Sequence, residues 1–164
     1  MNSKIIIILI VIIAIAISFY TGFLIEKESS EHADDLMTVQ VFFGNTIFDP
    51  EVIDCQKNFP VERKIAKTQA VATAALEQLL QGPTPAEKVQ GYITSINPGV
   101  KIQSLIIENG TARVDFDETL QANIGGSCRV AAIRFQIYNT LKQFPTVKDT
   151  VISINGRTED ILQP

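Results

Sequence analysis

The fold of this chain is decided by residues 100–117, Val-Lys-Ile-Gln-Ser-Leu-Ile-Ile-Glu-Asn-Gly-Thr-Ala-Arg-Val-Asp-Phe-Asp. Asn109-Gly110 stands between two apolar runs, and this dipeptide is the strongest short signal for a β-hairpin because both residues tolerate the positive φ of its turn. The return strand, residues 111–117, alternates apolar and polar side chains, so one face is buried and the other is wet. The stretch therefore predicts an antiparallel hairpin.

A helix is predicted before the hairpin. From Thr68 onward apolar residues recur at the spacing of one helix face, i, i+3, i+4, i+7 and i+8, and Gly82-Pro83 ends the pattern. A capping box at residues 84–87, with proline at the first helical position, predicts a second, short helix that ends at Gly91.

A longer helix is predicted after the hairpin, from Cys128 to about Phe144. Ala131, Phe135 and Tyr138 widen its apolar stripe beyond a single line. The inner side of the stripe consists of Val130, Ile133, Ile137, Leu141 and Phe144.

Strands at residues 39–43 and 150–154 complete the predicted domain, and Arg63-Lys64-Ile65 allows one more short strand. The resulting order is β-α-β-β-α-β. The apolar faces of the two main helices are buried economically when both helices cover one face of an antiparallel or mixed sheet of about four strands. We therefore expect an α+β fold, a two-layer sandwich.

An N-terminal membrane anchor is predicted in front of this domain. Residues 5–25 carry no charge, and as a helix they would span roughly 31 Å, the thickness of a hydrocarbon core. The apolar run is longer than a cleaved signal peptide needs, and no cysteine follows it to take a lipid. These features predict an uncleaved signal anchor, a single transmembrane helix.

The flanks of the span predict its orientation. Lys4 precedes it and an acidic segment follows it, which places the N-terminus in the cytoplasm and the domain outside. The predicted organisation is an anchor at residues 1–25, a polar tether at 26–38 and a globular domain at 39–164.

The cysteines are expected to form a disulfide. The chain has two, Cys55 and Cys128, and an even count in an exported protein favours a bridge over two buried free thiols. Cys55 lies in a long loop, residues 46–67, which such a bridge would pin down.

The sequence offers few candidate catalytic residues. The one histidine, His32, lies in the tether, and Cys128 has no base that can be placed beside it. Asp115, Asp117 and Glu118 could serve an extracytoplasmic hydrolase, by acid/base chemistry or by holding a metal. The alternation of the strand explains these carboxylates equally as its wet side. We expect no enzyme, metal or cofactor, and keep the hydrolase as the alternative.

Surface residues are the other candidates. The net charge of −4 and the absence of a basic stripe exclude a nucleic-acid partner. If both helices cover one sheet face, the open face carries Phe42 with Gln40, Arg113, Asp115 and Asp117, a candidate interaction face. A third hypothesis, a ligand sensor, would need an apolar cleft between loop 46–67 and the sheet.

Five stretches in order resemble one family. They are Ala-Leu-Glu-Gln-Leu-Leu-Gln-Gly-Pro-Thr (75–84), Thr-Ser-Ile-Asn-Pro-Gly (94–99), Asn-Gly-Thr-Ala-Arg-Val-Asp-Phe-Asp (109–117), Phe-Pro-Thr-Val-Lys (144–148) and Ile-Asn-Gly-Arg (154–157). Together they are similar to the GerMN domain, a sporulation and spore-germination module, over about residues 39–157.

The resemblance implies a non-enzymatic domain of the cell envelope, tethered to the membrane, with no catalytic residues to carry over. It also implies a role in scaffolding complexes or in association with peptidoglycan. The partners expected are therefore the membrane, and an envelope protein, a second copy of the chain or cell-wall glycan.

Overall fold

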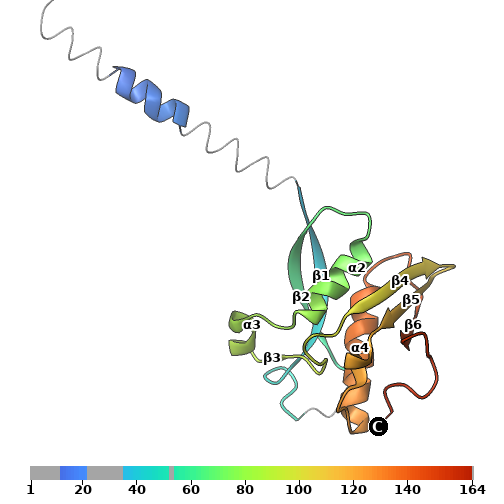
Figure 1. The fold of residues 1–164 in the computed structure, drawn as a ribbon. Coiled ribbons are helices and arrows are strands. Elements are labelled where there is room, and N and C mark those ends of the chain that lie inside the picture. Colours follow the sequence, from blue (N-terminus) through green and yellow to red (C-terminus); the bar gives the residue numbers. More distant parts are fainter. Residues whose placement is uncertain (1–11, 22–34, 52–53, 164) are drawn as a thin grey trace, which may run out of the picture. The chain divides into compact units, whose positions relative to one another are not determined.

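The computed structural model describes residues 12–21, 35–51 and 54–163 (Figure 1). The chain divides into two units, Met1–Met37 and Thr38–Pro164. In the first unit, residues 12–21 form a helix with exposed side chains. Among the described helices, none is both long and apolar enough to cross a bilayer. The predicted span extends beyond the described residues at both ends, and residues 26–34 of the predicted tether lie outside them.

The first sheet has three strands in the order β2-β1-β3. They are β1 (Leu36–Asn45), β2 (Phe59–Ala66) and β3 (Tyr92–Ile93), with β1 and β3 antiparallel. Strand β1 begins inside the predicted tether, because the alternation of its side chains starts before residue 39. The buried side of β1 consists of Val39, Val41 and Phe43.

The second sheet contains the predicted hairpin, in the order β4-β5-β6. Strands β4 (Ile102–Glu108) and β5 (Thr111–Phe116) are antiparallel, and the turn residues Asn109 and Gly110 have φ of 50° and 82°. Positive φ at both positions is what a type I′ turn requires, so the hairpin prediction is confirmed. Strand β6 (Asp149–Ile154) pairs with β5 in parallel, because a helix carries the chain back between them.

The helices are α2 (Val71–Leu80), α3 (Pro85–Val89), the short 3₁₀ helix η1 (Glu118–Gln121) and α4 (Ser127–Lys142). The capping box is present as predicted: the hydroxyl of Thr84 accepts the Glu87 amide hydrogen bond, and the Glu87 carboxylate accepts from the Thr84 amide.

One hydrophobic core joins both sheets to α2 and α4. Helix α4 packs against both α2 and β6. The largest fully buried apolar side chains are Phe43, Leu76, Leu79, Phe116, Leu120, Ile133, Ile137, Leu141 and Ile154.

An ion pair joins β2 to α3. The Arg63 guanidinium donates two hydrogen bonds to the Glu87 carboxylate, at 2.5 and 2.6 Å, and both side chains are largely shielded from solvent. This bidentate pairing lowers the pKa of Glu87, although desolvation acts in the opposite direction. The cap of α3 and the edge of the first sheet are thereby fixed to each other.

The α+β class is confirmed, but the single four-stranded sheet is wrong. The chain forms two sheets of three strands, because β1 pairs with β2 and β3 rather than with the hairpin. Strand β3 has only two residues, and β2 is longer than the predicted short strand at residues 63–65. Periodicity identifies strands but carries no information on which strands pair.

Candidate binding site between helix α4 and strand β6

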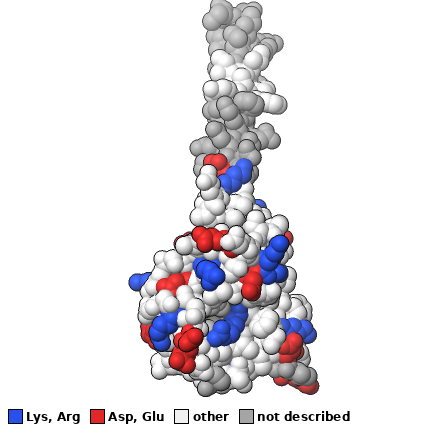
Figure 2. Space-filling view, turned by 90° about the vertical axis from the view of Figure 1, so that its right-hand side faces the viewer, with Lys and Arg blue, Asp and Glu red and all other residues white. Residues whose placement is uncertain are grey.

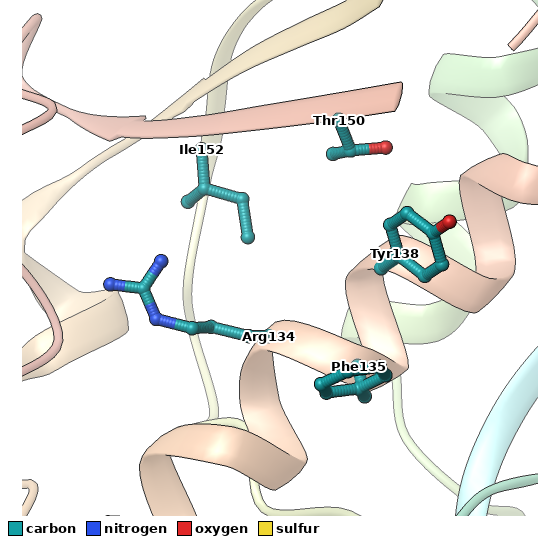
Figure 3. Close-up of a pocket in the computed structure, with 5 residues that line it drawn as sticks. All are labelled: Arg134, Phe135, Tyr138, Thr150 and Ile152. Carbon is teal, nitrogen blue, oxygen red and sulfur yellow. The ribbon is translucent and has the colours of Figure 1, made fainter. Parts of the chain in front are cut away.

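A hollow of about 340 Å³ lies between α4 and β6. Figure 3 shows its lining: Arg134, Phe135 and Tyr138 project from the helix, and Thr150 and Ile152 project from the strand. Residues 134 and 138 are one helical turn apart, and residues 150 and 152 alternate along a strand, so each pair shares a face of its element. The volume falls within the range of binding pockets for small molecules and side chains.

Aromatic rings form the helix side of the hollow. The ring centroids of Phe135 and Tyr138 lie 5.9 Å apart in an edge-to-face arrangement. The Lys142 ammonium lies 5.9 Å from the Tyr138 centroid. Both rings are half-buried although they flank the core-facing side of α4, so they present apolar surface outside the core.

The polar groups around the hollow are incompletely paired. The Thr150 hydroxyl oxygen is buried and has no hydrogen-bond partner within the described part of the chain. The Arg134 guanidinium donates to the Ile161 carbonyl (3.0 Å), and the Lys142 ammonium donates to the Lys148 carbonyl (2.6 Å). Among residues 12–21, 35–51 and 54–163, neither cation has a carboxylate partner. The hollow is therefore largely apolar, with the Arg134 charge and one unpaired hydroxyl in its lining and the Lys142 charge beside its Tyr138 ring.

Two of the predicted acidic residues have structural roles. The Asp115 carboxylate accepts hydrogen bonds from the Ser153 hydroxyl (2.6 Å) and the Gly156 amide (2.9 Å), which joins β5 to the end of β6. Asp117 accepts from the Lys101 amide at 3.1 Å and from the Thr119 hydroxyl at 3.0 Å. Both carboxylates thus organise the backbone around them.

Glu118, the third member of the predicted set, is exposed and acts in the same way. It accepts hydrogen bonds from Gln121, from Asn155 (3.2 Å) and from Arg157 (3.0 Å). The hydrogen bond from Gln121 and the charge of Arg157 lower the pKa of Glu118, whereas a catalytic acid needs a raised one. The described residues contain no cluster of three or more histidine, cysteine, aspartate or glutamate side chains that could hold a metal.

The predicted interaction face is split between the two sheets. Phe42 belongs to β1, whereas Arg113 and Asp115 belong to β5. Phe42 is half-buried, and its amide donates to the Thr140 hydroxyl of α4 (3.2 Å). Asp117 lies beyond β5, where it precedes η1. Gln40 is exposed on β1, and His32 lies outside the described residues.

The disulfide prediction is confirmed. Cys55 and Cys128 are bonded, with their Cα atoms 5.1 Å apart, and the bridge fastens the loop after β1 to the first turn of α4. A hollow of about 50 Å³ lies beside the bridge, bordered by Asn45 and Gln136 among others. Because binding pockets start at about 300 Å³, this space is too small for the ligand of the sensor hypothesis.

Sequence reasoning did not identify the α4–β6 hollow. The signal that could have found it is the width of the apolar stripe, since Phe135 and Tyr138 lie beside the residues that face the core. Thr150 and Ile152 gave no comparable signal, because any strand at the edge of a sheet shows the same alternation.

The fold and the site define a small α+β domain with a covalently pinned loop and an apolar hollow at a sheet edge. Its family follows from comparison: the model "Germane: Sporulation and spore germination" matches residues 40–160, and the chain belongs to this family. None of the curated proteins compared with the chain matches it.

Solved structures agree with the family assignment. The tandem GerMN domains of the sporulation protein GerM from Bacillus subtilis are similar at 25% identity and a TM-score of 0.59, over 76% of this chain and 40% of that one. The first GerMN domain of the same protein is similar at 18% identity and a TM-score of 0.53, over 74% of this chain and 85% of that one. This chain therefore spans less than half the length of the tandem structure.

Proposed function

We propose that this chain is a membrane-tethered, extracytoplasmic domain that binds a protein of the cell envelope through the hollow between α4 and β6, in a process of sporulation or germination. Three features support the proposal: the family, the uncharged segment of residues 5–25, and the disulfide, which is typical of oxidising compartments outside the cytosol.

The observation that carries the binding role is the apolar hollow itself. Phe135 and Tyr138 keep part of their apolar surface accessible in the lining of this hollow, and apolar surface of this kind is typical of interaction sites. Asp115, Asp117 and Glu118, by contrast, are held by local hydrogen bonds. The site is therefore better suited to recognition than to catalysis.

Site-specific photocrosslinking tests the binding role. The full chain is expressed in its native cells with p-benzoylphenylalanine in place of Tyr138, and crosslinked products are identified by mass spectrometry. The matched control replaces Ile106, which is 53% exposed on the solvent-facing side of β4. We expect one defined envelope protein at position 138 and none at 106. Equal products at both positions, or only glycan at 138, would contradict the proposal.

Protease treatment of intact cells tests the location. If the domain lies outside the membrane, added protease removes the domain epitope without lysis, whereas a cytoplasmic control protein survives. Protection of the domain until the cells are lysed would refute the proposed orientation.

A further inference from the structure

We infer that the hollow and the free edge of β6 together form a strand-addition site, on which an extended segment of the partner protein becomes a fourth strand of the second sheet. This inference rests on the proposed function and specifies the form that its partner takes.

The backbone of β6 has an outer edge that is open ahead of Ile154, where the chain turns back and Ile154 exchanges two hydrogen bonds with Arg157 (2.9 and 3.0 Å). The Asp149 amide donates to the Gly110 carbonyl (3.0 Å), so alternate residues starting at Asp149 turn their backbone groups toward β5. Thr150 and Ile152, which lie between them, turn theirs away. In the described part of the chain no strand pairs with this outer edge at Thr150 or Ile152, and Figure 1 shows β6 at the margin of its sheet. The Thr150 amide is satisfied by the Asp149 carboxylate (2.8 Å), which leaves the Ile152 amide for a partner.

An added strand would find an apolar surface on which to pack. A new strand would lie about 4.8 Å beyond β6, on the side of the hollow, where its inward side chains would meet Phe135 and Tyr138. The added strand would then cover the part of these two rings that is accessible in the hollow. Helix-and-strand grooves of this kind bind extended peptides by backbone pairing, with side-chain pockets adding specificity.

The charged side chains near the hollow indicate which side chains the added segment carries. The cations next to the groove are Arg134 and Lys142, and their hydrogen bonds go to backbone carbonyls rather than to carboxylates. The acidic residue at the start of β6, Asp149, is engaged with its neighbouring amide. On the face shown in Figure 2, acidic and basic side chains are interspersed, so the selectivity comes from these two local charges and not from a broad field. The fitting segment alternates apolar with acidic side chains.

The test uses a synthetic peptide with this pattern, alternating valine and glutamate around one phenylalanine. Its control is the same peptide with every second backbone nitrogen methylated, which removes the hydrogen-bond donors along one edge and keeps all side chains. Both are added to the full chain in lipid nanodiscs, and backbone hydrogen exchange is followed over β6. We expect exchange at Ile152 to slow by about tenfold or more with the first peptide only.

Two variants of the chain complete the test. Arg134→Gln should weaken peptide binding about tenfold, because it removes a charge-assisted contact. Arg113→Gln, on the opposite face of β5, should leave binding unchanged. Arg134 also holds the Ile161 carbonyl, so melting curves of both variants establish that the domain stays folded, and Arg134→Lys should restore part of the affinity.

The outcomes separate this inference from the proposed function. If position 138 crosslinks to an envelope protein but neither the peptide nor the crosslinked segment protects Ile152, the docking role stands and strand addition is refuted. Equal protection by the methylated peptide also refutes it. If the crosslinked species is a second copy of this chain, the site is an interface between copies and the inferred partner is wrong.

Discussion

Replacing Thr150 with valine should stabilise the unliganded chain. The two side chains have the same shape, and both favour strands. The Thr150 hydroxyl is buried beside the hollow without a hydrogen-bond partner in the described residues. An unpaired buried polar group costs roughly 1–3 kcal/mol. Removing it should therefore raise the free energy of unfolding by about 1 kcal/mol, which corresponds to a melting temperature about 4 °C higher for a domain of this size.

The measurement is urea and thermal unfolding of the full chain with its disulfide intact. The matched control on the same strand is Ser153→Ala. The Ser153 hydroxyl donates to the Val114 carbonyl (3.3 Å) and the Asp115 carboxylate (2.6 Å), so its loss should cost about 1 kcal/mol. Opposite signs for the two variants are expected. If Thr150→Val destabilises as much as Ser153→Ala, the hydroxyl has a partner such as a bound water, and the reasoning fails.

Three further predictions concern the framework. Replacing both Cys55 and Cys128 by serine should lower the free energy of unfolding by about 4 kcal/mol, because the bridge closes a loop over a separation of 73 residues. An unchanged urea midpoint would contradict this prediction. Glu87→Gln should lower the free energy of unfolding by about 1–2 kcal/mol at neutral pH, because the ion pair with Arg63 is lost. A decrease of less than about 0.3 kcal/mol, which is in the range measured for exposed ion pairs, would refute this prediction. Because the folded-state pKa of Glu87 lies below its unfolded value of 4.5, that contribution is complete above pH 4.5 and disappears as the pH falls through the folded-state pKa, which unfolding at a series of pH values will show. Gly91→Ala should destabilise by about 2 kcal/mol, because φ is +86° and the new Cβ would lie 2.8 Å from Ile47; a neutral melting curve would refute it.

Local features of this fold were predictable where one or two residues dictate the backbone. Asn109-Gly110 specifies the turn by its tolerance of positive φ, and the capping box at Thr84 specifies a helix start by its own hydrogen bonds. The bridge between Cys55 and Cys128 followed from counting, since only one intramolecular pairing is available.

Strand partners were not predictable in the same way. Strand β3 contributes only Tyr92 and Ile93, which is too short for any alternation to be recognised. Its pairing with β1 depends on the position of the preceding α3, which is a tertiary effect. The hollow was missed for a related reason: whether Phe135 and Tyr138 contact another element depends on where the sheet ends, and sequence periodicity does not contain that information.

The central place of β1 in its sheet has a mechanical consequence. Strand β1 lies between β2 and β3, and it is the strand through which the N-terminal segment enters the domain. A pulling force directed along β1 from Leu36 therefore acts in shear on the hydrogen bonds to β2 and on those that Gly44 and Asn45 share with β3, instead of separating an edge strand one hydrogen bond at a time. A domain built this way can carry tension between whatever holds its N-terminus and whatever grips its far side.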